Sequence, residues 1–392
     1  MRADVLVAGG GCVGVLAAGL CAQAGWRVVL ATPQAPLRPL NPDAPPNPRV
    51  IALAPLVEQA LQAAGVPPSP WRERACPVHS MDVSVPGQGG LCFQAREAGL
   101  PELAHIVEVP ALQQALESWA QSLGVRRIDE SVLHHQEGVA ELDSGARIEA
   151  QLLLACDGAD SGLRQAAGID TRQRDYRQQA IVARLRFAQP HHSQARQTMG
   201  GEGVLGVLPL VDGSVSVVWS LPEAQAAYWL AAPAAEFAEG LSLALAAPWG
   251  EARLLGPRQS FPLRAIRAEQ LHAPGLALLG DAAHTVHPLA GLGLNLGLAD
   301  ALSLVEVLRR ARQQGRALDD PASLAAWSRS RRAAVLPYTA FIDALAGLET
   351  EHVFAWRGVA SGFNSVQRWQ AVKSFFIHQA SKGSLAGSAG TA

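Results

Sequence analysis

The feature that most constrains this chain is a glycine-rich loop close to its start. Residues 4–8 (DVLVA) have the character of a buried strand, and GGGCVG follows from Gly9. Residues 15–24 have helical character, and residues 27–31 form the next apolar run. In such a GxGxxG loop the glycines let the backbone approach a diphosphate, and the following helix directs its positive N-terminus at the charge. The pattern predicts a nucleotide-binding βαβ unit; the alternative is a tight turn with a structural role only.

One position departs from the usual form of this unit. Its second strand generally ends in Asp or Glu, which accepts hydrogen bonds from the adenosine ribose, whereas this chain has Thr32 there. A hydrogen bond to a charged group contributes about 1.5–3 kcal/mol and a neutral one about 0.5–1.5 kcal/mol. We therefore expect Thr32 to replace only part of the contact.

A second glycine-rich segment occupies residues 275–304 (GLALLGDAAHTVHPLAGLGLNLGLADALSL). Residues 276–279 have the length of a short buried strand, which Gly280 and Asp281 end, and from Leu294 the apolar residues recur at helical spacing. A carboxylate, a glycine-rich loop and a helix N-terminus in succession suit a polar ligand held by backbone N–H groups. The alternative is an ordinary strand-to-helix connection in which the glycines serve packing.

The remaining elements alternate between strands and helices, with a buried strand at residues 152–155 followed by CDGADSGLR. Val211-Asp212-Gly213 indicates a hairpin. We expect other strands in residues 76–93, 125–150, 176–187, 204–210, 214–220 and 259–263, and helices at 55–64, 110–123, 222–247 and across most of 321–380.

Composition narrows the class of protein. The 392 residues suffice for two domains or one two-lobed unit, and 49% hydrophobic against 17% charged residues allow a large core. A net charge of −2 without a basic stripe argues against nucleic acid. No apolar run reaches transmembrane length, and the N-terminus reads as a strand rather than a secretory signal. Five scattered cysteines without a CxxC pair are typical of reduced thiols, so we expect a cytoplasmic protein.

Taken together, GGGCVG, CDGADSGLR and LLGDAAHTVHPLAGLGLNLGLADA resemble the FAD-dependent aromatic hydroxylases, the single-component flavoprotein monooxygenases. NPRVIAL at Asn47 and SRSRRA at Ser328 resemble the ubiquinone-biosynthesis branch of that family. The resemblance runs from Asp4 to about Gln379. It implies an α/β fold in which a Rossmann-type FAD-binding domain is interleaved with a β-sheet substrate domain, followed by C-terminal helices.

The domain boundaries that we expect follow the motifs. The FAD-binding domain would comprise residues 1–75, 106–175 and 266–315, and the substrate domain would comprise strands in 76–105 together with residues 176–265. A C-terminal helical region would occupy residues 316–380, and a disordered tail residues 381–392.

The resemblance also implies a role for individual residues. Two positions would lie at the reactive edge of the flavin or its substrate, Pro288 and, beside it, His287. The FAD-binding set comprises Gly9, Gly11 and Gly14 at the diphosphate, Thr32 at the ribose, Arg49 near flavin and diphosphate, Asp157 and Gly158 touching FAD and the nicotinamide donor, Asp281 at the ribityl–diphosphate region, and Gly291, Leu292, Gly293, Leu294 and Asn295 at the pyrimidine end of the flavin.

The chemistry implied is hydroxylation of an electron-rich ring. NAD(P)H, a transient reductant, would reduce FAD, and oxygen would then give a flavin hydroperoxide that attacks a polyprenylated phenol of ubiquinone biosynthesis. The protein would position the phenol and exclude water, while the cofactor supplies the reactivity. Other ubiquinone-biosynthesis proteins are expected partners. C-terminal aromatic residues such as Trp356 and Phe375 are typical of a helix-packing core, and the alternative is that an exposed subset makes peripheral contact with the inner membrane.

Two other hypotheses remain open at this stage. The chain has Glu108-Val109-Pro110 where the branch often has Glu-Asn-Arg, and Leu292 where it often has Gln. Together with Thr32 these departures suit a flavin-poor, non-catalytic relative acting as a scaffold. The other alternative is a hydroxylase of a different aromatic substrate.

Several polar side chains also have more than one interpretation. No metal site is expected, because no carboxylate or thiol cluster joins His284 and His287. Arg164 is either an ion-pair partner or a phosphate neighbour. Arg329, Arg331 and Arg332 suggest a solvated helix face, and the alternative is a contact with anionic lipid or a partner.

Overall fold

The computed structural model describes residues 1–392 except 42, 201–202, 246–248, 288–292 and 347–392, and for residues 341–346 it describes the backbone only. The predictions for Pro288, Gly291 and Leu292 therefore lie outside the described residues. The same holds for the helices expected beyond residue 346 and for the disordered tail.

The first of three sheets has eight strands and a parallel centre. Strand β1 pairs in parallel with β2 on one side and with β11 on the other, and β8 and β19 extend the parallel arrangement outward. Because the parallel centre of such a sheet is covered on both faces, β1, β2 and the second half of β11 are continuous apolar runs rather than alternating ones. The strands are β1 (Arg2–Ala8), β2 (Val28–Ala31), β8 (Arg126–Ile128), β9 (Val132–Gln136), β10 (Val139–Leu142), β11 (Arg147–Ala155), β18 (His272–Ala273) and β19 (Leu276–Leu278).

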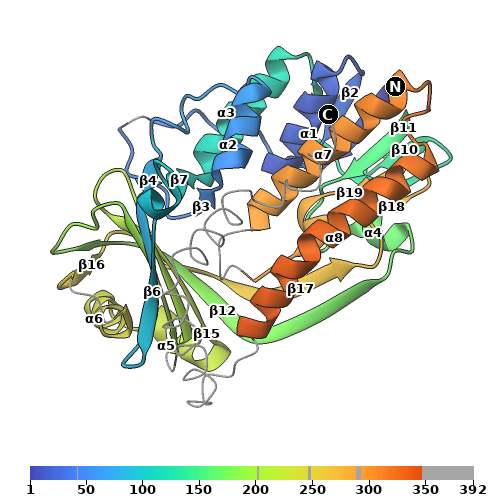
Figure 1. The fold of residues 1–392 in the computed structure, drawn as a ribbon. Coiled ribbons are helices and arrows are strands. Elements are labelled where there is room, and N and C mark those ends of the chain that lie inside the picture. The colour runs from blue at the N-terminus through green and yellow to red at the C-terminus, as the bar shows by residue number, and fades with distance from the viewer. Residues whose placement is uncertain (42, 201–202, 246–248, 288–292, 347–392) are drawn as a thin grey trace.

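Helices pack against this sheet and share the main apolar core with it. Helix α1 (Cys12–Gln23) contacts α3 (Val109–Ser122) and α7 (Gly293–Gln313). Figure 1 shows these helices gathered at one side of the molecule, with the N-terminus near them. The strand–helix–strand order of the first 31 residues confirms the Rossmann-type fold predicted from the glycine loop.

The second sheet has nine strands and is almost entirely antiparallel. Helices α5 (Glu223–Ala231) and α6 (Ala234–Leu245) cover one of its faces. The strands are β5 (Ser80–Val85), β6 (Gly89–Gln94), β12 (Thr171–Phe187), β13 (Gln194–Gly200), β14 (Gly203–Pro209), β15 (Val215–Pro222), β16 (Ala252–Leu254), β17 (Gln259–Ala268) and β20 (His284–Thr285). The predicted hairpin at Asp212-Gly213 joins β14 to β15.

The single helix expected over residues 222–247 is wrong, since the chain breaks it at Ala232. This residue has an extended backbone, with φ −56° and ψ 148°. The cause is Pro233, whose ring excludes the helical conformation from the residue before it and which has no N–H to donate.

A small third sheet and short connecting helices link the two larger sheets. The sheet comprises β3 (Val50–Leu53), β7 (Ala104–Glu108) and β4 (Cys76–Val78), and Figure 1 shows it where the two larger sheets approach each other. Its residues share an apolar cluster with β13 of the second sheet. Helices α2 (Pro55–Ala63) and α4 (Gly162–Ala166) and the short turns η1 (Ala95–Ala98) and η2 (Gly280–Ala282) lie in the connections.

Helix α8 (Pro321–Ala346) begins near the first sheet and extends toward β12 and β17 of the second (Figure 1). It packs on α7 and β18. A search of the described residues finds no helix with the length and hydropathy needed to cross a membrane.

Trp219 is the central side chain under the second sheet. It is 0% exposed, and its ring centroid lies 5.3 Å from that of Trp229 and 6.1 Å from that of Phe237. We expect Trp219→Ala to lower the free energy of unfolding by about 3–5 kcal/mol, as measured by urea titration. Leu243→Ala is the control, because that leucine is 75% exposed on α6; equal losses in the two variants would contradict this account of the core.

Candidate flavin site

The three sequence motifs begin side by side at one edge of the first sheet. The Gly9 N–H donates to the Ala31 carbonyl at 2.9 Å, the Cys156 N–H to Ala8 at 2.7 Å, and the Leu279 N–H to Ala155 at 3.0 Å. Each of these bonds joins residues at the carboxyl ends of neighbouring parallel strands. This edge, outside the carboxyl ends of the strands, is where open α/β sheets bind ligands.

The three glycines of the first loop differ in what a side chain at each position would meet. Gly9 has φ +114°, and a Cβ there would lie 2.1 Å from the Cys156 carbonyl oxygen. A Cβ on Gly14 would lie 2.0 Å from the Gly9 oxygen, so the first turn of α1 contacts the end of β1 directly. By contrast, no heavy atom of the described residues lies within 4 Å of a Cβ on Gly11. The first and third glycines serve packing, and the second faces open space.

The N-terminus of α1 borders that open space. Gly11 is its N-cap residue; within the described chain no side chain caps the helix, and no acidic residue lies in its first turn. The first backbone N–H groups of a helix have no intrahelical acceptor and carry the positive end of its dipole. An uncapped helix end beside a glycine without neighbours fits a diphosphate.

The Asp157-Gly158 loop is tied to the Asp281 loop from beneath. Ser161 caps α4 by accepting from the Arg164 N–H at 3.0 Å. The Arg164 guanidinium is 3% exposed and donates to the carbonyls of Ala282 and Ala159, each at 2.9 Å. Arg164 thus joins two loops through their carbonyl oxygens, and its interpretation as a phosphate neighbour stays a prediction.

Asp157 and Gly158 themselves face outward. The Asp157 side chain is exposed, and its Oδ2 accepts from the Leu163 N–H at 3.2 Å. Gly158 has φ +91°, and no described atom lies within 4 Å of a Cβ placed on it. The loop therefore presents a carboxylate and a bare backbone at the same edge as Gly11.

Asp281 has a carboxylate that is open to solvent on one side and crowded by protein atoms on the others. This crowding raises the pKa of Asp281 because it disfavours the charged form, although the positive fields of His284 and Arg49 act in the opposite sense. Arg49 is exposed at the start of β3, and its carbonyl accepts from the Val109 N–H at 3.0 Å. The predicted contacts Arg49 and Asp281 thus lie within electrostatic reach of each other.

The first turn of α7 lies against the first turn of α1. A Cβ on Gly297 would lie 2.7 Å from Val13 Cγ2 and 3.0 Å from Gly280 Cα. The Asn295 side chain is 1% exposed; its Oδ1 accepts from the Ala54 N–H at 2.9 Å, and its Nδ2 donates to the Ala52 carbonyl at 2.8 Å. Asn295 therefore uses its side chain to hold α2 onto α7. The backbone N–H groups of Gly293 and Leu294 lie at this helix start, as the sequence predicts.

The two histidines of this segment have different partners. The His284 Nε2 lies 2.7 Å from Asp300 Oδ2, whereas the His287 Nε2 lies 3.4 Å from Gln178 Oε1. His287 is 1% exposed, and its ring meets that of Tyr176 edge-on at 5.1 Å. Among the described residues no group of three or more His, Cys, Asp or Glu side chains is arranged to hold a metal ion.

Comparisons with known proteins agree with this geometry. The sequence profile of the FAD binding domain family matches residues 2–336. The 3-demethoxyubiquinol 3-hydroxylase of Escherichia coli is 33% identical over 323 residues, 80% of this chain and 81% of that protein. The ubiquinone hydroxylase UbiL of Rhodospirillum rubrum is 32% identical over 394 residues, 96% of this chain and 89% of that protein. The chain belongs to the FAD binding domain family.

A solved structure shows the same fold. The p-nitrophenol 4-monooxygenase PnpA of Pseudomonas putida superposes with a TM-score of 0.78 at 20% identity, covering 96% of this chain and 98% of PnpA. The protein is therefore an FAD-dependent aromatic monooxygenase, as the sequence motifs predicted, and NAD(P)H is the usual reductant of such enzymes.

Two side chains next to departures from the family pattern contact Gly10 in this flavoprotein. One is Thr32 itself, and the other is Gln113, which lies close to Val109 and Pro110. Thr32 is 0% exposed and packs on Gly10, and its hydroxyl donates to Gln34 Oε1. Gln113 was missed by the sequence analysis; one turn after Pro110, its Nε2 donates to the Gly10 carbonyl at 2.6 Å and to Glu117 Oε1 at 2.8 Å. The clue in the sequence was a Gln on the face of α3 that also carries buried leucines.

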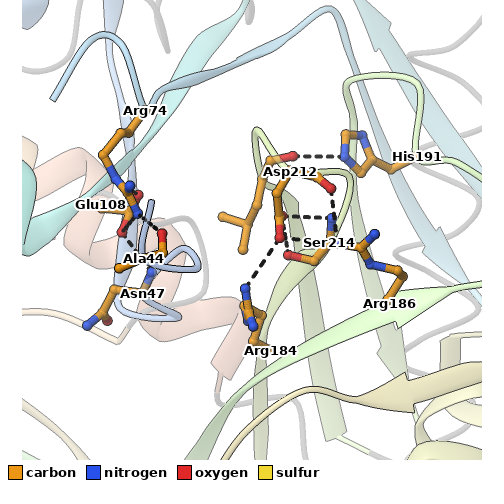
Figure 2. Close-up of polar contacts among 10 residues, drawn as sticks. Ala44, Asn47, Arg74, Glu108, Arg184, Arg186, His191, Asp212 and Ser214 are labelled. Atoms are coloured by element: carbon orange, nitrogen blue, oxygen red, sulfur yellow. Dashed lines mark hydrogen bonds and ion pairs between the residues drawn. The ribbon is translucent and has the colours of Figure 1, made fainter. Parts of the chain in front are cut away.

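Glu108 lies in the segment where the branch often has Glu-Asn-Arg. It holds in place the residues that come just before Arg49. Its carboxylate is 2% exposed and accepts from Arg74 Nε at 2.7 Å and from the Asn47 N–H at 2.7 Å. Arg74 also donates to the Ala44 carbonyl at 3.0 Å. Figure 2 shows this cluster gathered around the segment that leads to Arg49.

A second cluster in Figure 2 fixes the hairpin tip of the nine-stranded sheet. Asp212 accepts from Arg184 at 3.3 Å, from Arg186 at 3.1 Å and from the Ser214 N–H at 3.0 Å. Burial raises the pKa of Asp212, but the bonds from Ser214 and the two guanidinium charges outweigh it and lower the pKa overall. Next to this tip the Ser216 hydroxyl donates to the Pro48 carbonyl at 2.6 Å, which joins the sheet to the segment before Arg49.

Gly11→Ala separates ligand contact from folding. The added methyl group meets no described protein atom, so the free energy of unfolding should change by less than about 1 kcal/mol. It points into the space where the FAD diphosphate would lie, so the dissociation constant for FAD should rise by about tenfold or more. Fluorescence titration of the apoprotein with FAD measures this, and Gly256→Ala, also without close neighbours, is the control. Unchanged FAD affinity in Gly11→Ala would place the diphosphate elsewhere.

Asp281→Asn tests whether the charged Asp281 carboxylate lowers the stability of the folded apoprotein. A folded-state pKa raised above the unfolded value gives stability that is present at low pH and is lost as pH rises through the folded pKa. The apoprotein of Asp281→Asn should therefore melt above the wild type at pH 7, and the difference should vanish toward about pH 4. The same variant should bind FAD more weakly. A variant that melts below the wild type across this pH range would contradict the assignment.

Proposed function

We propose that this monooxygenase hydroxylates the aromatic ring of a polyprenylated phenol in ubiquinone biosynthesis, with FAD as cofactor and NAD(P)H as reductant. The similarity to the E. coli and R. rubrum ubiquinone hydroxylases supports the pathway. The observation that carries the proposal in the structure is an apolar sheet face turned toward the flavin motifs.

Two hydrogen bonds identify which face of the nine-stranded sheet meets the flavin domain. Gln178 on β12 contacts His287, and Ser216 on β15 donates to Pro48. The register of β12 and β15 places Gln178 opposite Pro222 and Ser216 opposite Arg184, so all these residues share one face. The other face, which carries Trp219, packs on α5 and α6.

The face toward the flavin motifs is predominantly apolar. At its centre Gly206 pairs with Val218 and Gln197, and neither Val204 nor Val218 is fully buried. The absent side chain at Gly206 leaves room for a flat ring between two valines. By register the same face also carries Val83, Leu91, Val182, Met199, Phe261 and Leu263. Phe261 is exposed and Val204 and Val218 are partly exposed, whereas the other apolar side chains of this face are buried. An apolar face of this kind suits a phenol with a hydrocarbon tail better than a small polar aromatic.

The chain's own residues would hold the reactants as follows. When bound, FAD supplies the reduction and oxygen activation. The loop whose close packing depends on Gly9 and Gly14 would hold the FAD diphosphate at the open backbone of Gly11. The N-terminus of α7 would stabilise negative charge on the reduced ring. His287, fixed between Gln178 and Tyr176, would orient the phenol at the flavin edge. The roles given to Pro288, Gly291 and Leu292 remain predictions from the family resemblance.

We also propose that the enzyme takes its substrate from the surface of the inner membrane, alongside other ubiquinone-biosynthesis proteins, because a polyprenyl tail partitions into lipid. Flotation of the holoenzyme with phospholipid vesicles measures this directly. Absence of vesicle binding with and without substrate would remove this part of the proposal.

The pathway is tested by deleting the gene. The deletion strain should lack ubiquinone and accumulate a precursor that is short of one ring hydroxyl, as read by mass spectrometry of lipid extracts. Purified protein should be yellow and should oxidise NAD(P)H faster when a prenylated phenol is present. Normal quinone levels with a yellow, phenol-stimulated enzyme would instead favour a different aromatic substrate, and a colourless protein that takes up no FAD would favour the scaffold.

Gly206→Leu should fill the space over the centre of the apolar face. We expect kcat/KM for the prenylated phenol to fall by roughly 10–100-fold, while the dissociation constant for FAD stays unchanged. Steady-state NAD(P)H oxidation and FAD titration measure the two. Val211→Leu at the exposed hairpin tip is the control; an unaffected kcat/KM in Gly206→Leu would mean that the substrate ring lies elsewhere.

A further inference from the structure

One buried carboxylate binds three polar groups from two distant parts of the chain. Asp300 on α7 is 0% exposed. It accepts from the Gly280 N–H at 3.0 Å, contacts His284 Nε2 at 2.7 Å, and accepts from Arg331 Nε of α8 at 2.8 Å. Arg331 is itself 3% exposed and also donates to the Leu296 carbonyl at 3.3 Å, so the expectation that it belongs to a solvated helix face is wrong.

These contacts fix the backbone on both sides of Asp281. Gly280 precedes Asp281 and has φ +59°, and His284 follows three residues later in β20. Asp300 therefore binds both ends of a five-residue segment from behind. The Asp281 carboxylate belongs to this segment and is exposed to solvent, and it is the group expected at the ribityl–diphosphate region of FAD.

The charge of Asp300 depends on α8. Burial alone would raise the pKa of Asp300, but His284 and Arg331 more than compensate and lower it. Arg331 is a permanent cation, so α8 supplies a fixed positive charge opposite a carboxylate that is buried away from water. Without Arg331, Asp300 would have to protonate or move, and in either case it would bind Gly280 and His284 less well.

We propose that Arg331 is a positioning residue for FAD: through Asp300 it holds the Asp281 segment in its binding conformation, so docking of α8 and binding of FAD are coupled. Because such coupling is reciprocal, FAD should also strengthen the docking of α8. The proposal depends on FAD binding and not on the identity of the aromatic substrate, so its measurements stand whether or not the enzyme acts in ubiquinone biosynthesis.

The first test compares neighbouring arginines of α8. Arg331→Met should weaken FAD binding by about tenfold or more, the usual scale for losing a buried charge-assisted contact. Arg332→Met removes the same charge from an exposed position and should leave FAD affinity unchanged. Fluorescence titration of each apoprotein with FAD gives the dissociation constants. Equal FAD affinity in wild type and Arg331→Met would overturn the proposal.

A second variant separates positioning from folding, because Arg331→Met leaves a buried carboxylate without its cation. Asp300→Leu combined with Arg331→Met removes both charges, and well-packed apolar pairs often restore stability. We expect the melting temperature of this apoprotein to recover toward the wild type while FAD binding stays weak, since Gly280 and His284 still lack their acceptor. Recovery of both stability and FAD affinity would show that the pair is structural only and would overturn the proposal.

Hydrogen exchange gives a readout that does not depend on activity. In the wild type, saturating FAD should slow amide exchange in residues 321–340 of α8. In the double variant, FAD at a concentration that saturates it should leave exchange in those residues unchanged. Exchange in wild-type α8 that does not respond to FAD would contradict the coupling.

Discussion

The contact between Gly9 and the Cys156 carbonyl is the constraint on which the flavin site depends. A Cβ at Gly9 would lie 2.1 Å from that oxygen, so the ends of β1 and β11 approach each other as only a glycine allows. This approach aims the N-terminus of α1 at open space. Gly14 and Gly297 allow similarly close contacts. Gly14 lies between α1 and the end of β1, and Gly297 lies between α7 and α1. Close packing of backbone thus gathers the two helix N-termini and the Asp157 loop at one edge of the sheet.

The strands and helices at this edge could be predicted from the sequence because the two kinds of element differ in the spacing of their apolar residues. Buried parallel strands are short apolar runs, and helices repeat every three to four residues. What the sequence could not reveal were the polar partners far along the chain. Asn295 reaches residues 52–54, Gln113 reaches Gly10, and Arg331 reaches Asp300. The periodicity of apolar residues indicates which face of a helix is buried, but it does not indicate which polar group of another element that face contacts.

The departures from the family pattern matter less than the side chains alone suggest. Thr32 is turned to Gln34 and leaves the ribose position without a carboxylate. However, the diphosphate in such a site is held mainly by backbone N–H groups of a helix start, and these depend on Gly9, Gly11 and Gly14 rather than on Thr32. Gln113 in turn fixes the Gly10 carbonyl, which keeps the loop in shape without a charged residue.

Asp281 and Asp300 show how the same fold places two carboxylates in opposite environments. Asp300 is fully buried, yet its pKa is lowered because it has a cation and several donors. Asp281 remains open on one side, yet its pKa is raised because its crowded surroundings are not fully offset by the positive groups nearby. In the unliganded protein the second arrangement destabilises the fold. Asp281 is thus a destabilised group at the ligand-binding edge, and the stabilised Asp300 holds its segment. Such an arrangement is expected where selection for binding, rather than for folding stability, has shaped the site.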